Sequence, residues 1–155
     1  MKSPIKSCML AIGLLAACHS AKQGDTLADS IRAYNEGVRW ERYGAAAVHV
    51  PPAERSEFID ELDQRAKDLR ITDYEIVRVE QKSEKLAQVQ IKVSWYLDSE
   101  GTLKETSARQ TWERHGKTWW VVEETRLRGK EMPGLREDRS NEDTQAAASP
   151  EATEQ

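Results

Sequence analysis

The sequence predicts one α+β domain, in which helices cover one face of an antiparallel sheet. Apolar residues recur at helical spacing between residues 25 and 69, and they alternate with polar residues from residue 71 onward. Short polar turns separate the alternating segments, and turns of that length join antiparallel neighbours. The 155-residue chain has room for one such domain with shorter segments at both ends.

The first 18 residues have the pattern of an export signal. Lys2 and Lys6 give a positive start, and an uncharged run of ten residues ends at Ala17. Ten residues are fewer than the roughly 20 that cross a bilayer as a helix. The run Leu15-Ala-Ala-Cys18 is similar to the lipobox of bacterial lipoproteins. The alternatives are a plain signal peptide with a chance cysteine and a buried first helix.

The lipobox resemblance implies that residues 1–17 are removed and that Cys18 carries lipid. Cys18 then holds a thioether-linked diacylglycerol and an acylated amino group, and stable anchoring in a bilayer needs more than one acyl chain. Residues 18–24 form a lipidated tether. By the same resemblance, an Asp at the position of His19 retains lipoproteins in the inner membrane of enteric bacteria. We therefore expect an outer-membrane location, facing the periplasm.

Two amphipathic helices open the domain, which we expect to span residues 25–128. Asp25 is the expected N-cap of the first helix. The apolar face of that helix consists of Leu27, Ile31, Tyr34, Val38, Trp40, Tyr43 and Ala47, and the helix is expected to continue towards His49. Gly37 and Gly44 weaken the helix, and the alternative is a bend or a close packing contact at these glycines. Pro51 and Pro52 end it and suit the first turn of a second helix. The second apolar stripe consists of Phe58, Ile59, Leu62, Ala66 and Leu69. His49 is expected to be a loop residue.

Four strands are expected after the helices. They cover residues 71–81, 85–97, 103–115 and 118–125. Polar turns at residues 82–83, 98–101 and 116–117 join them into a meander. From residue 129 to residue 155 the chain holds three basic and seven acidic residues with few apolar ones. A disordered acidic tail is predicted there.

The turn lengths fix a strand register that agrees with the hydrophobic pattern. A two-residue turn at 116–117 pairs Trp112 with Val121, and a four-residue turn at 98–101 pairs Ile91 with Ala108. A slip of one residue would turn every side chain to the opposite face. The expected core face of the sheet consists of Ala87, Val89, Ile91, Val93, Trp95, Ala108, Trp112, Trp119 and Val121.

This order of elements resembles the NTF2-like superfamily, in which a curved sheet wraps helices into a cone. The resemblance covers residues 25–125. Its clearest local feature is the segment from Gln110 to Val121, where a Trp, a turn glycine and a second Trp match the closing hairpin of many members. A cystatin-like sheet with one long helix is the nearest alternative. The resemblance implies a pocket at the mouth of the cone, where isomerases and dehydratases of the superfamily use an inward Asp, or an Asp–His pair, as general base.

The candidate ligand site lies on the inward face of the sheet. Its residues are Tyr74, Arg78, Trp95, Gln110 and Trp112. Glu123 is the only strand acid with inward parity, and it lies near the sheet end, so no general base is expected. Alternatively, Tyr74 and Gln110 are hydrogen-bonded core residues and Arg78 extends to the rim.

Several functional classes are not expected. The sequence has no metal-ligand spacing, phosphate loop, dinucleotide motif or hydrolase nucleophile motif, so we expect no metal, no cofactor and no catalytic residue. Basic residues are interleaved with acids, so no nucleic-acid partner is expected either.

The outward face of the sheet carries a candidate interface. Its residues are Val77, Val79, Leu86, Trp120 and Val122. The expected registers align Val79, Leu86, Glu113 and Trp120 in one row. They also pair Arg109 with Glu124 on this face. Apolar residues on the side of the sheet that would otherwise face solvent indicate that another segment or molecule covers them. The cover is a second copy, a protein of the cell envelope, or a lid formed by Leu127, Met132, Pro133 and Leu135.

These patterns together predict a lipid-anchored, non-catalytic binding module for a protein partner or a small hydrophobic ligand. The alternative is a small-molecule enzyme of the isomerase or dehydratase type that works in the cone.

The lipid anchor can be tested by metabolic labelling. Cells that express the full chain are grown with a clickable fatty acid, and the labelled protein is detected on a gel. We expect labelling of the wild type and none of Cys18→Ser, because the thioether and the new amino terminus both belong to Cys18. Equal labelling of the two chains would refute the anchor.

Overall fold

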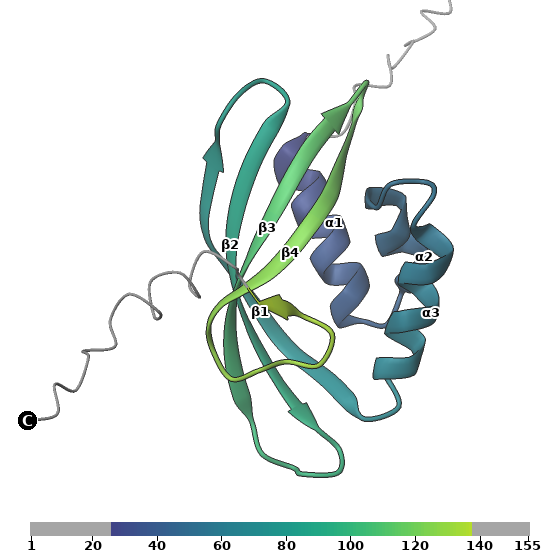
Figure 1. The fold of residues 1–155 in the computed structure, drawn as a ribbon, viewed down its shortest axis with the longest axis vertical. Helices are drawn as coiled ribbons and strands as arrows, with labels where there is room; N and C mark the ends of the chain where they lie inside the picture. Colours follow the sequence, from purple (N-terminus) through teal and green to yellow (C-terminus); the bar gives the residue numbers. More distant parts are fainter. Residues whose placement is uncertain (1–25, 138–155) are drawn as a thin grey trace, which may run out of the picture.

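The computed structural model describes residues 26–137, so the expectations for Cys18 and residues 138–155 lie outside the described part. The N-cap of the first helix is Thr26, so the prediction of Asp25 as its N-cap is wrong. Three helices come first: α1 (Leu27–Arg39), α2 (Tyr43–Ala46) and α3 (Arg55–Arg65), with a 3-10 turn η1 (Ala47–His49) after α2. The strands β1 (Leu69–Gln81), β2 (Leu86–Leu97), β3 (Lys104–His115), β4 (Thr118–Gly129) and β5 (Arg136–Glu137) follow. The helices form one layer against the concave face of a curved sheet (Figure 1), which confirms the α+β class.

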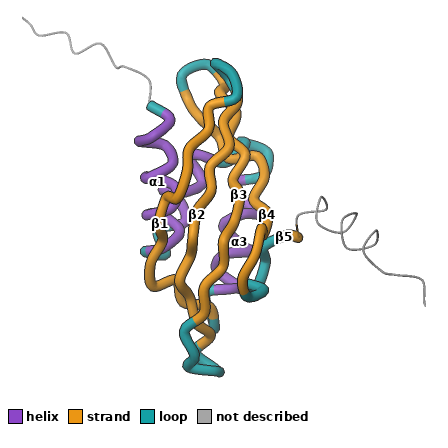
Figure 2. Tube along the Cα trace, turned by 90° about the vertical axis from the view of Figure 1, so that its left-hand side faces the viewer, coloured by secondary structure: helices purple, strands orange, loops and turns teal. Residues whose placement is uncertain are grey.

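The five strands lie side by side in chain order. Neighbours from β1 to β4 are antiparallel, whereas the two-residue β5 runs parallel to β4. Figure 2 shows this order across the convex face, with α1 behind the β1 side and α3 behind the β4 side. No helix between residues 26 and 137 is long and apolar enough to cross a membrane.

The predicted core, the register of β2 with β3 and the register of β3 with β4 next to their turn are confirmed. Trp112 pairs with Val121, and Ile91 pairs with Ala108. Every residue of the expected core face is buried, and Trp95 and Trp112 are the largest side chains that are fully enclosed. Ile31 and Tyr34 of α1 pack against them from the helix layer. Tyr34 meets Trp112 edge to face, with the ring centroids 5.7 Å apart.

The first helix ends earlier than the apolar spacing predicts. Thr26 caps α1 by accepting a hydrogen bond from the Asp29 amide, and α1 stops at Arg39. Glu41 then takes a left-handed conformation, with φ of 55°, and the chain turns back into α2. This turn brings Gly37 against Ala46, so closely that a methyl group at Gly37 would lie 2.9 Å from the Ala46 Cβ. The prediction of one helix up to His49 is therefore wrong.

His49 is buried at the end of η1. Only 5% of its surface is exposed, and its Nδ1 lies 3.2 Å from the carbonyl oxygen of Trp119. The expectation of a loop histidine is wrong, because the turn after α1 folds η1 onto β4.

Strand β4 contains an extra residue, Val122, which changes the direction of the side chains that follow. Trp112 pairs with Val121, but the preceding residue Thr111 pairs with Glu123, so Val122 has no partner on β3. A bulge of this kind shifts the in-and-out alternation by one position. Glu124 consequently pairs with Gln110 and faces inward, whereas Glu123 is exposed. The predictions of an inward Glu123 and of an outward Glu124 paired with Arg109 are both wrong.

Two further bulges lie in the edge strand β1. Thr72 and Val77 are skipped in the strand register. Ile71 and Asp73 pair with the successive residues Trp95 and Ser94, and Ile76 and Arg78 pair with Ile91 and Gln90.

These bulges correct two placements on β1. Arg78 pairs with the outward Gln90, so it points away from the pocket, is exposed and forms an ion pair with Glu80. Val79 pairs with Val89 instead of joining the row of Leu86. The expected inward Arg78 and the Val79–Leu86 alignment are wrong.

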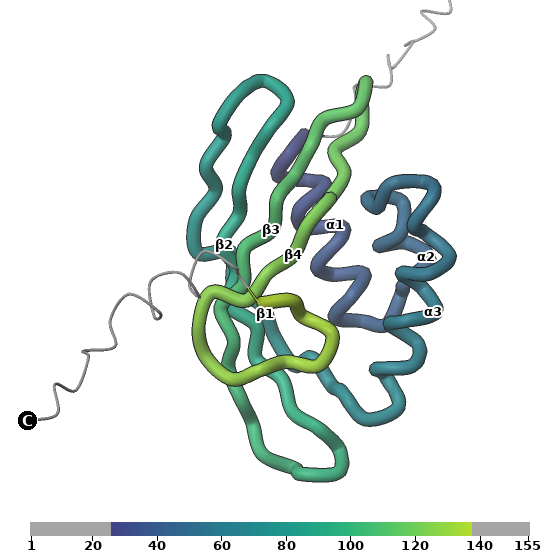
Figure 3. The backbone as a smooth tube through the Cα atoms, in the orientation of Figure 1, coloured from purple at the N-terminus to yellow at the C-terminus, as the bar shows by residue number. Residues whose placement is uncertain are grey.

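The chain after β4 folds back onto the concave side. Residues 130–135 form a loop that returns to β4 through the parallel pair of Thr125 with Arg136 (Figure 3). Arg126 Nε and Nη2 donate to the two carboxylate oxygens of Glu137, at 2.6 and 2.7 Å. The predicted disorder from residue 129 is thus wrong for residues 129–137. We call residues 130–137 the C-terminal strap.

The close contact of α1 with α2 gives a stability test. We expect Gly37→Ala to lower the free energy of unfolding by about 1–3 kcal/mol, because the new methyl overpacks against Ala46. Gly44→Ala is the matched control: a methyl there meets nothing within 4 Å, so we expect about 0.5–1 kcal/mol of stabilisation. Urea unfolding followed by tryptophan fluorescence measures both. Two variants of equal stability would contradict the proposed contact.

Candidate functional site

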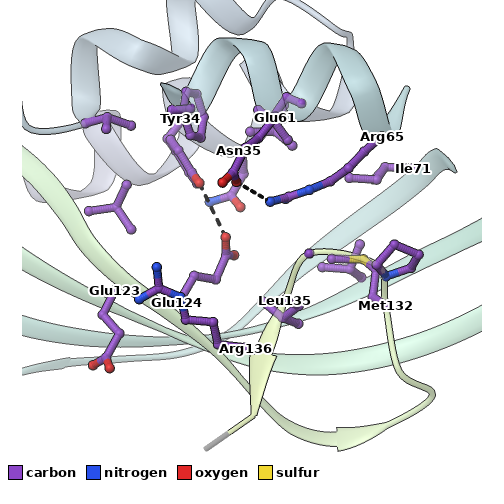
Figure 4. Close-up of a pocket in the computed structure, with 18 of the residues that line it drawn as sticks. Tyr34, Asn35, Glu61, Arg65, Ile71, Glu123, Glu124, Met132, Leu135 and Arg136 are labelled. Atoms are coloured by element: carbon purple, nitrogen blue, oxygen red, sulfur yellow. Dashed lines mark hydrogen bonds and ion pairs between the residues drawn. The ribbon is translucent and has the colours of Figure 1, made fainter. Parts of the chain in front are cut away.

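A pocket of about 400 Å³ lies between α3, the concave face of the sheet and the C-terminal strap. Its apolar wall comes from α1, α3 and the inner sheet face, and includes Val38, Phe58, Leu62, Ile91, Val93 and Val121. Figure 4 shows the polar side chains that project into it, from α1 and α3 on one side and from β4 and the strap on the other. A volume of this size suits a small organic molecule.

Glu124 stands at the inner wall of the pocket because of the bulge at Val122. Its Oε2 accepts a hydrogen bond from the Tyr34 hydroxyl at 3.3 Å, and its Oε1 accepts one from the Gln110 side-chain amide at 2.9 Å. These two donors come from α1 and β3, so the carboxyl group is held between the helix layer and the sheet (Figure 4).

The amide side chains of Gln110 and Asn35 form a hydrogen-bonded pair next to this carboxyl group. Gln110 is fully buried, and its Nε2 donates to Asn35 Oδ1 at 2.9 Å. Asn35 Nδ2 donates in return to Gln110 Oε1 at 3.3 Å and to the carbonyl of Ile31 at 2.8 Å. The Trp112 indole N–H donates to the same Gln110 oxygen. Because its amide dipoles are satisfied in one orientation, Gln110 presents N–H, not oxygen, to Glu124.

The electrostatics of the site favour a protonated Glu124 relative to a free glutamate. Burial raises the pKa of Glu124, and the hydrogen bonds from Gln110 and Tyr34 together with the charge of Arg65 lower it only in part. Burial and the neighbouring Glu124 also raise the pKa of Tyr34 well above its ordinary value, so Tyr34 remains a donor.

The strap closes one side of the pocket. Met132 and Leu135 are half-buried against the core and line the cavity. The Arg65 guanidinium of α3 lies directly against Gly134, where a Cβ would approach its Cζ to 2.0 Å. Gly134 has a φ of 80°, a conformation that glycine adopts without strain. The lid residues expected on the outer sheet face, Met132 and Leu135, thus cover the inner face instead.

The structure brings together only part of the predicted ligand site. Tyr74 lines the pocket and donates to Glu36 at 3.2 Å. Gln110 lies beneath the pocket wall and contacts it through Glu124. Trp95 and Trp112 are core residues, and the Trp95 indole N–H donates to Thr106 at 2.8 Å. Arg78 is outside the site.

Pattern reading missed the residues that give the pocket its polarity. Tyr34 was expected only as part of an apolar helix face, and Asn35 was not singled out. Glu124 was expected on the outer face, because strict alternation assigns it there. No sequence signal marks Val122 as a bulge, since Val suits a regular strand equally well.

The candidate interface on the outer face is smaller than expected. Leu86, Glu113 and Trp120 lie in one row, as predicted. Trp120 is half-buried and stacks on the exposed His115, with ring centroids 4.2 Å apart. Val77 and Val122 are bulge residues, 54% and 36% exposed, and Val79 belongs to another row. The five residues therefore do not form one continuous apolar patch.

Within residues 26–137, no group of three or more His, Cys, Asp or Glu side chains is arranged to hold a metal ion.

The pH dependence of stability tests the environment of Glu124. Folding favours its protonated form, so the stability of the wild type relative to Glu124→Gln should fall as the pH rises above the ordinary value of 4.5 and through the raised pKa of the folded protein. Urea unfolding of both proteins between pH 4.5 and 8 measures the difference. Glu123→Gln, at the neighbouring exposed position, shows what loss of one charge does alone. A wild-type stability that stays constant or rises with pH, relative to that of Glu124→Gln, would contradict the assignment.

Comparison with known proteins places the fold. No protein-family model and no curated protein matches the sequence. The structure is similar to a SEC-C motif-containing protein from Rhodopseudomonas palustris, with a TM-score of 0.56 and 10% identity over 64% of this chain and 77% of that one. It is also similar to a ketosteroid isomerase-like protein from Erwinia carotovora atroseptica, with a TM-score of 0.53 and 12% identity over 70% and 98%. A third neighbour is a domain of unknown function with a cystatin-like fold from Nostoc punctiforme, with a TM-score of 0.52 and 14% identity over 80% and 97%. These likenesses support an NTF2-like, cystatin-like α+β fold for this chain.

Proposed function

We propose that this chain is a lipoprotein of the bacterial cell envelope whose domain binds a small, largely apolar molecule in the pocket beside Glu124. The observation that carries the proposal is the pocket itself, with a volume of about 400 Å³ and a buried carboxyl group on its wall. A binding module that uses only its outer face needs no such cavity, because a domain core packs densely.

The lipobox-like run that ends at Cys18 supports the membrane location. The tether of residues 18–24 leads into α1, and we infer that it holds the domain at the periplasmic face of the outer membrane. A pocket that binds a small molecule needs no catalytic step to serve there as a carrier or a sensor.

The arrangement around Glu124 favours binding over isomerase-like or dehydratase-like catalysis. An enzyme of that kind needs a carboxylate as base and a separate donor aimed at the developing oxyanion. Here the Tyr34 hydroxyl donates to Glu124 itself, so the donor and the acid form one unit. The likeness to a ketosteroid isomerase-like protein, at 12% identity, supports only the fold in this argument.

The candidate interface on the outer sheet face is smaller than the sequence predicts, so it gives little support to a protein-binding role. Leu86 and Trp120 are half-buried in the row that the structure retains, and His115 covers part of the Trp120 ring. The proposal therefore assigns the binding role to the pocket and not to the outer face.

Titration with an uncharged dye tests the pocket. N-phenyl-1-naphthylamine fluoresces strongly in apolar surroundings, and we expect wild-type protein to bind one equivalent. Ile71→Trp should weaken this binding at least tenfold, because Ile71 lines the cavity and the larger ring fills it. Val77→Trp is the matched control on the same strand, at an exposed position outside the pocket, and should bind the dye like the wild type. Absence of wild-type binding, or equal binding by all three folded proteins, would refute the proposal.

A further inference from the structure

The walls of the pocket carry many more acidic than basic side chains. Five acidic residues line it, and Arg65 and Arg136 are the only basic ones among the described lining residues. The five acids are Glu54, Glu57, Glu61, Glu123 and Glu124. An excess of one sign in a concave site concentrates ligands of the opposite charge.

The acids come from two sides of the cavity. Glu57 and Glu61 are four residues apart on α3, so they share one side of that helix, and Glu54 lies at its N-cap. Glu123 and Glu124 come from β4, across the cavity (Figure 4). A ligand that enters between α3 and β4 therefore meets carboxyl groups on both walls.

The two cations do not neutralise this set. Arg65 binds Glu61 at 2.6 Å and is held against Gly134 of the strap. Arg136 is exposed on β5. Among the described residues, no ion pair is found for Glu54, Glu57 or Glu124.

Aromatic rings and free lone pairs complete the environment. Tyr34, Phe58 and Tyr74 line the pocket, and the Tyr34 and Phe58 rings lie 5.9 Å apart. Ring faces attract alkylammonium groups, most strongly where water is excluded. Glu124 accepts two hydrogen bonds, whereas a carboxylate offers about four acceptor positions, so it retains acceptors for an ammonium N–H.

We propose that the ligand of this pocket is an organic cation, with an apolar body against the inner sheet face and an ammonium group beside Glu124. This inference rests on the proposed function and names the chemical class of its ligand. A neutral ligand leaves the acidic walls unpaired, and an anionic one is repelled by them.

Three probes share the same hydrocarbon cage but differ in charge, so they separate the effect of ligand charge on affinity from that of ligand shape. 1-Adamantanamine is a cation at neutral pH, 1-adamantanol is uncharged, and 1-adamantanecarboxylate is an anion. Calorimetric titration of wild-type protein at pH 7.5 and low salt should show the amine binding at least tenfold more tightly than the alcohol. The carboxylate should bind most weakly.

Two variants test whether the preference for the amine over the alcohol depends on Glu124. Glu124→Gln should reduce the amine-to-alcohol ratio to less than threefold while affinity for the alcohol stays within twofold of wild type. Glu84→Gln is the matched control, because it removes one exposed carboxylate in the turn before β2, outside the pocket, and should keep the wild-type ratio. Circular dichroism confirms that each variant is folded.

The outcomes distinguish the two proposals. If the dye binds but the amine has no advantage over the alcohol, or does not bind, the cationic ligand is overturned and the pocket remains a binding site. If neither the dye nor any adamantane binds, the proposed function fails as well. A preference for the amine that survives in Glu124→Gln would overturn the placement of the ammonium group.

Discussion

The bulge at Val122 determines which chemistry the concave face carries. It adds one residue to β4 opposite a regular β3, so the positions after it change faces. Without it, Glu124 would point outward and Glu123 would take its place near the end of the sheet. With it, a carboxyl group meets Tyr34 of α1 and Gln110 of β3 in the middle of the molecule. The position and protonation of the acid, and the polarity of the pocket, all follow from this local change.

The hydrogen-bonded side chains of Asn35 and Gln110 fix the position of the Glu124 carboxyl group. Asn35 and Gln110 exchange two hydrogen bonds, and the indole of Trp112 fixes the Gln110 oxygen. A buried amide with an unused donor costs free energy, so Gln110 needs an acceptor where Glu124 stands. The helix layer and the sheet are therefore joined by polar contacts at the same depth as the tryptophan core. This is a reason for α1 to hold one orientation on the sheet.

The sequence predicts the sheet well because two independent signals, turn length and alternation, act on the same residues. Ile91, Trp112 and Val121 are buried and paired as expected from both. It predicts the site poorly because bulges carry no compositional mark, and alternation fails beyond them. The early end of α1 is predicted only in part. Gly37 indicates a bend or a close contact, but Trp40 and Tyr43 continue the helical period, and the turn at Glu41 depends on the contact of Gly37 with α2.

The edge strand β1 has a consequence for how copies of this protein behave when crowded. An exposed strand edge is a template for pairing with another chain, and β1 is thirteen residues long with exposed Ile76 and Val79. Its bulges at Thr72 and Val77 break the regular spacing of backbone donors and acceptors along that edge. The backbone donors and acceptors of a second strand paired with this edge would match those of β1 over only a few residues. The irregular edge is thus a poorer template for another strand than a regular edge of the same length would be.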